Sequence, residues 1–98
     1  MERRLGFVGI IVEDRAAAAP RVNAVLSDHA DLIVSRTGLP YAKRGCHVIT
    51  LIVDATTDAL GELTGRLGQI EGVAVKSALA RSRLPETAPG GGAGGDVA

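Results

Sequence analysis

The sequence has 98 residues, enough for one small domain that buries a modest fraction of its surface. Eleven basic and eleven acidic side chains cancel, so no overall field draws the chain to nucleic acid or to an anionic membrane. A single cysteine excludes an internal disulfide, and no apolar run approaches the roughly 20 residues that span a bilayer. We therefore expect a cytoplasmic protein that contacts neither nucleic acid nor membrane directly.

Two stretches are apolar at nearly every position: residues 5–12, LGFVGIIV, and residues 45–54, GCHVITLIVD. A strand with one wet face alternates apolar and polar residues, whereas a strand covered on both faces is continuously aliphatic. We expect these two strands to be the middle pair of a sheet. Gly6 and Gly9 in the first stretch leave room for a close approach of backbone or ligand.

A helix is predicted after each of these strands. Pro20 is tolerated near a first turn, so the first helix should begin at residues 17–19, and its apolar face ends at His29. The second helix covers residues 58–70 and follows capping residues at 56–58. Its three glycines indicate either a close neighbouring backbone or a weak helix rescued by packing. The face of the first helix is Ala18, Val22, Val25, Leu26 and His29, and that of the second is Leu60, Leu63, Leu67 and Ile70.

Two further strands are expected, over residues 31–38 and 73–79. Simple alternation in the first of these places Arg36 on one face with Leu32 and Val34. The order β-α-β-β-α-β predicts an α+β, ferredoxin-like sandwich over residues 1–81, a four-stranded antiparallel sheet with both helices on one face. Residues 82–98 are rich in Pro and Gly and are expected to form a disordered tail.

Two helices can cover one face of such a sheet, yet both middle strands are apolar on both faces. A second copy of the chain would resolve this conflict by covering the other face or by extending the sheet edge. A small core also supplies little stability by itself. We therefore predict a homodimer or a dimer of dimers.

No catalytic arrangement stands out, and we expect the protein not to be an enzyme and to carry no cofactor. The best polar set for a small ligand is Glu13, Asp14 and Arg15 at the first strand–helix junction, together with Arg36 and Thr37. Helix capping and surface ion pairs also explain these residues, and we favour that interpretation over ligand binding.

Cys46 and His47 form a cluster of two soft metal ligands. Adjacent residues on a strand point to opposite faces, so one chain cannot easily chelate a metal with both. Across a subunit interface they could do so, with His29 as a third ligand. A metal-binding sensor or carrier is therefore the alternative function.

Several pieces of the sequence, IVSRTGLPY, LIVDATTD, LTGRLG and GVAVKSAL, together resemble a family of small bacterial iron-only hydrogenase system regulators. The resemblance implies an ACT-like fold, similar to the C-terminal ligand-binding domain of nickel-responsive repressors, in which domains pair through their sheets. The spaced histidines and cysteine of those repressors are not matched here, so nickel sensing is not carried over. The expected function is a non-enzymatic, oligomeric regulatory module, linked to hydrogenase regulation, that senses a small ligand or docks a partner protein.

Overall fold

The computed structural model describes residues 2–13 and 15–81, and for Arg15 the backbone alone. Asp14 and the tail predicted over residues 82–98 lie outside the described residues. Two short 3-10 turns, η1 (Ala30–Leu32) and η2 (Ala42–Arg44), flank the second strand. The main elements are β1 (Arg4–Val12), α1 (Arg15–Asp28), β2 (Ile33–Tyr41), β3 (Cys46–Ala55), α2 (Thr57–Gly68) and β4 (Val73–Leu79).

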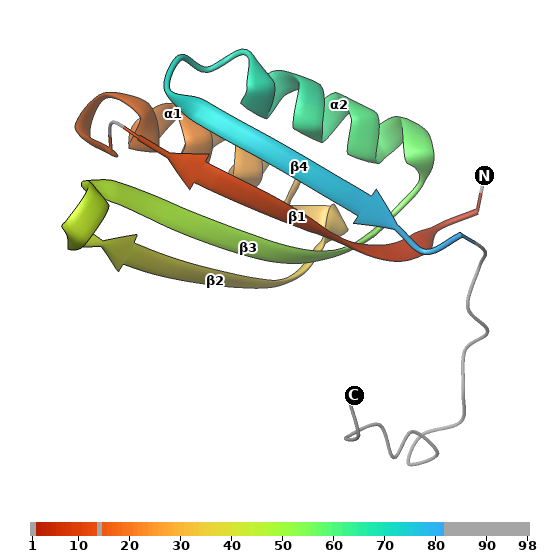
Figure 1. Ribbon diagram of the computed structural model, residues 1–98. Coiled ribbons are helices and arrows are strands. Elements are labelled where there is room, and N and C mark those ends of the chain that lie inside the picture. Colours follow the sequence, from red (N-terminus) through yellow and green to blue (C-terminus); the bar gives the residue numbers. More distant parts are fainter. Residues whose placement is uncertain (1, 14, 82–98) are drawn as a thin grey trace, which may run out of the picture.

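The four strands form one antiparallel sheet in the order β2-β3-β1-β4. Both helices lie on the same side of this sheet, and the opposite side carries no layer of the described chain (Figure 1). The predicted ferredoxin-like architecture is confirmed, and so is the placement of the two apolar stretches as its middle strands. We call the sheet surface that packs on the helices the helix face, and the opposite surface the open face.

Alternation along the middle strands supplies both faces with apolar side chains. On β1, Val8, Ile10 and Val12 are fully buried under the helices, whereas Phe7 and Ile11 point to the open face. Strand β3 follows the same rule, because each of its residues faces the same way as its cross-strand partner on β1. The helices complete the core with the residues that the sequence predicted, including His29, which is 6% exposed.

Helix α1 begins earlier than predicted. It starts at Arg15, and Pro20 lies inside the helix rather than near its first turn. A proline inside a helix removes one backbone hydrogen bond, and here burial of Ala18, Val22 and Leu26 against the sheet compensates for it. Tertiary packing has overridden the local preference of the sequence at this position.

The predicted side-chain directions along β2 are wrong beyond Ile33. The pairing of β2 with β3 shifts register between Ile33 and Ser35, and such a bulge reverses the side-chain alternation that follows it. Arg36 therefore lies opposite the buried Leu51 and points to the helix face, away from the exposed Val34 with which it was expected to share a face. The strand also runs on to Tyr41, beyond its predicted end.

The glycines of α2 have no close neighbour that requires them. A Cβ added at Gly61 or Gly65 would meet no atom within 4 Å, and one at Gly68 would make ordinary contact with Val75. Of the two interpretations of these glycines, the structure supports the second. The glycines make α2 an intrinsically weak helix, and packing of its leucines stabilises it. Gly6 differs, because a Cβ there would collide with the carbonyl oxygen of Ala78 and would lie 2.6 Å from Leu79 Cδ2.

Gly6→Ala should destabilise the fold, because the backbone of β4 has to move away from β1 to admit the methyl group. Overpacking of this kind costs about 1–3 kcal/mol in the free energy of unfolding. Gly9→Ala is the matched control on the same strand, since a Cβ at Gly9 meets nothing within 4 Å. Urea denaturation of both variants measures the difference, and equal unfolding free energies would contradict the proposed close approach.

Candidate functional site

The residues predicted to bind a ligand do not form one site. Arg36 and Thr37 point to opposite faces of the sheet, because they are consecutive residues of β2. Glu13 follows the end of β1 and is exposed, and the backbone of Arg15 begins α1. The structure instead places Glu13 and Arg36 in two separate depressions, one on each face of the sheet.

The depression on the open face is wide and shallow, with a volume of about 790 Å³. It lies where the turn between β2 and β3 approaches the end of β1. Gly45, at φ 64°, closes that turn and presents two basic side chains beside it. The lining residues are Ile11, Glu13, Tyr41, Lys43, Arg44 and Cys46.

The depression on the helix face is a small cleft of about 70 Å³ between α1 and the strands. Arg36 reaches across it and donates a hydrogen bond from Nη2 to Oδ1 of Asn23 on α1, at 2.7 Å. Arg36 thus contacts α1. We call this the α1 cleft, and its lining residues are Val12, Ala19, Val22, Asn23, Arg36, His47 and Ile49.

The rest of the open face is an apolar surface. Phe7 is 54% exposed and Leu39 is 57% exposed, and at the far end of the sheet an almost wholly apolar pocket of about 360 Å³ lies between β1, β3 and β4. Its lining includes Phe7, Ile52 and Ala78. The large apolar side chains exposed on this face are Leu5, Phe7, Ile11, Leu39, Tyr41 and Ile52.

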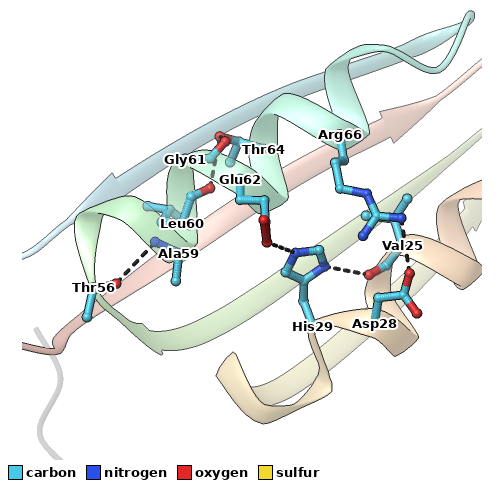
Figure 2. Close-up of polar contacts among 10 residues, drawn as sticks. All are labelled: Val25, Asp28, His29, Thr56, Ala59, Leu60, Gly61, Glu62, Thr64 and Arg66. Atoms are coloured by element: carbon cyan, nitrogen blue, oxygen red, sulfur yellow. Dashed lines mark hydrogen bonds and ion pairs between the residues drawn. The ribbon is translucent and has the colours of Figure 1, made fainter.

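A polar network joins the two helices on the other side of the molecule (Figure 2). Nδ1 of the buried His29 lies 2.9 Å from the carbonyl oxygen of Val25, and its Nε2 lies 3.2 Å from Oε1 of Glu62. Beside this pair, Arg66 donates to Asp28 at 3.0 Å. His29 is therefore held by Glu62 of α2 and Val25 of α1, and it lines neither of the depressions that Cys46 and His47 line.

Cys46 and His47 point to opposite faces of the sheet, as the alternation of a strand requires. Cys46 lines the depression on the open face, and His47 lines the α1 cleft. Within residues 2–13 and 15–81, no group of three or more His, Cys, Asp or Glu side chains could hold a metal ion. Metal binding across a subunit interface stays a prediction, but His29 is committed to the helix layer and is a poor third ligand.

Sequence reasoning missed two features of these sites. Nothing local in the sequence marked Asn23 as a partner of Arg36, because their contact depends on the bulge in β2 and on the packing of α1. The grouping of Lys43 and Arg44 with Glu13 depends on the register of β3 with both its neighbours. The one sign of this grouping in the sequence was the basic pair Lys43 and Arg44, close to Tyr41.

The fold and the two-faced sheet define the protein as an ACT-like domain with a ferredoxin-like fold. Residues 4–77 match a family model, TM1266-like, whose description is "Iron-only hydrogenase system regulator, putative". The chain belongs to this family. No curated protein matches it, and in the described part of the chain no helix is long and apolar enough to cross a membrane.

Solved structures agree with this assignment. The uncharacterized protein TM1266 from Thermotoga maritima is 37% identical with a TM-score of 0.77, over 80% of this chain and 98% of that one. The ACT domain of a GTP pyrophosphokinase from Chlorobium tepidum is 26% identical with a TM-score of 0.62, over 78% of this chain and 99% of that one. A formyltetrahydrofolate deformylase from Pseudomonas syringae is 15% identical with a TM-score of 0.57, over 84% of this chain and 29% of that one, and shows likeness of fold alone.

The buried histidine should matter more for stability than its carboxylate partner. His29→Ala removes a buried ring and its hydrogen bond to Val25, which we expect to lower the free energy of unfolding by about 1–3 kcal/mol. Glu62→Ala should cost less than about 1 kcal/mol, because the Glu62 side chain is 68% exposed and solvent screens the pair. Urea denaturation compares the two variants, and a larger loss for Glu62→Ala would show that the ion pair, not the buried ring, joins the helices.

Proposed function

We propose that this chain is a non-enzymatic regulatory module of the cytoplasm that self-associates through its open face and senses a small ligand or docks a partner protein. The observation that carries the proposal is the open face itself. It is apolar along both middle strands, although no element of the described chain packs on it.

A second copy of the chain is the occupant that suits this face. Only Lys76 and Asp54 carry charge among the open-face residues of the four strands, and their charges cancel. Four strands about 4.8 Å apart and about nine residues long present a flat footprint on the order of 500–600 Å². Large, mainly apolar exposed surfaces often serve binding, and this footprint is of the same order as the roughly 800 Å² per partner of a stable interface.

Phe7→Glu should convert the oligomer into a monomer, because the new carboxylate would have to leave water for an apolar interface, at a cost that a pair with the diagonal neighbour Lys76 would not repay. The fold should survive, since Phe7 is 54% exposed in one chain. Ala24→Glu adds the same charge at an exposed position of the helix layer and should leave the oligomer intact. Light-scattering mass at micromolar concentration distinguishes the variants, and circular dichroism checks that both are folded. A monomeric wild-type chain would refute the proposal.

The regulatory part of the proposal is supported by the family and by the ACT domain of the GTP pyrophosphokinase, which is a comparable fold within a larger protein. The family description points to the hydrogenase system as the context. Two depressions at one end of the sheet offer polar side chains to a ligand, and we infer from the family and the ACT-like fold that they bind rather than catalyse. Binding without turnover is the activity that suits them.

A thermal-shift screen with amino acids, nucleotides and divalent metals tests the sensing role. A ligand at 100 times its Kd adds about 2.7 kcal/mol to the free energy of unfolding, which raises the Tm of a small domain by several degrees. A shift with an organic ligand supports sensing. A shift with metals alone, lost in the double variant Cys46→Ala, His47→Ala, would replace it with the metal hypothesis. An oligomer without any shift would favour the docking of a partner protein.

A further inference from the structure

We propose that the α1 cleft binds a small oxyanion, a carboxylate or a phosphate group, through Arg36 and Asn23. The inference rests on the proposed sensing function and names the class of ligand that it would take. It begins from hydrogen-bond donors that have no acceptor in the part of the chain that the structure describes.

The bond between Arg36 and Asn23 fixes which atoms remain free. A guanidinium group can only donate hydrogen bonds, so the atom of Asn23 that faces it at 2.7 Å is the carbonyl oxygen Oδ1. The amide nitrogen of Asn23 then points away with both its hydrogens, and most donors of the Arg36 fork are also unused. Among the described residues, neither group has a further partner.

Asn23 and Arg36 are both exposed and border the α1 cleft, which among its described lining residues has one positive charge and no carboxylate. Among the described residues that line the cleft, Arg36 supplies this charge. The wall opposite is aliphatic, formed by Val12, Val22 and Ile49. Because Arg36 is exposed, water screens its charge, and the apolar wall limits that hydration on one side only. A planar guanidinium fork also matches the geometry of carboxylate and phosphate oxygens.

The size of the cleft limits what can enter. Its volume of about 70 Å³ corresponds to about two water molecules at the roughly 30 Å³ that each occupies in the liquid. One oxyanion group fills such a space, whereas a whole nucleotide does not. The anion is therefore either free in solution or the charged end of a metabolite whose remainder projects into solvent.

His47 forms another part of the cleft, and Gly38 determines where its ring lies. His47 Nε2 is 3.0 Å from the position that a Cβ would occupy at Gly38. The imidazole thus lies over the bare backbone of β2, on the same face as Arg36. A side chain at residue 38 would require this ring to shift by a few tenths of an ångström.

Titration of the isotopically labelled full chain with sodium phosphate, sodium acetate and sodium chloride at matched ionic strength tests the proposal. We expect phosphate or acetate to shift the side-chain NMR signals of Asn23 and Arg36 saturably, while chloride does not. Preference between the two anions tells a phosphate group from a carboxylate. Linear, non-saturating shifts with all three salts would overturn the inference.

Asn23→Asp is the decisive variant. Its shape is the same and its carboxylate still accepts the hydrogen bond of Arg36, so a purely structural contact would be kept or strengthened. Anion binding should fall at least tenfold, because the donor is replaced by a negative charge. Lys43→Met removes a cation from the depression on the open face and should leave binding unchanged. Loss of binding in Lys43→Met but not in Asn23→Asp would place the anion on the open face and contradict the proposal.

These results separate this inference from the proposed function. If neither anion binds while the chain is oligomeric and a neutral ligand raises its Tm, the oxyanion site is wrong and the sensing role stands. If the anions bind saturably to a monomeric chain, the site stands and self-association is wrong.

Discussion

The structure depends on a conflict between two aliphatic strands and the helices available to cover them. β1 and β3 carry apolar side chains toward both faces of the sheet, because β-branched and aliphatic residues occupy almost every position. α1 and α2 cover the helix face, where the core residues of β1 are fully buried. The open face keeps the same kind of surface in contact with water. Burying it would yield roughly 25 cal/mol for each Å² of apolar area removed from water, a substantial gain for a domain with a small core.

The same alternation organises the polar residues. Consecutive residues of a strand point to opposite faces. Cys46 therefore lies with Lys43 and Arg44 on the open face, whereas His47 lies with Arg36 under α1. Two depressions of different character result at one end of the sheet. The site on the open face lies at the margin of the proposed interface, whereas the α1 cleft lies behind the sheet and stays accessible in a face-to-face dimer. Self-association and binding of a small anion are therefore compatible.

Much of the fold could be predicted from the sequence, because it follows from periodicity. The continuous aliphatic stretches identified the middle strands. The spacing of Val22 and Leu26 identified the buried face of α1, and that of Leu63 and Leu67 the buried face of α2. The positions that could not be predicted depend on register. The bulge between Ile33 and Ser35 turned Arg36 toward α1, and no local pattern marks a bulge. Likewise Gly6 and Gly9 look alike in the sequence and both pair with β4, yet only at Gly6 would a Cβ collide with the backbone of that strand.

The central claim, that a second copy covers the open face, is tested most directly by isotope-filtered NOE spectroscopy. Equal amounts of labelled and unlabelled chain are mixed, so that contacts between copies are observed separately from contacts within one copy. We predict contacts between chains that link the Phe7 ring to methyl groups of the open face, such as those of Leu39 and Ile52. A chain that sediments as a monomer, or contacts between copies confined to the helices, would contradict the account.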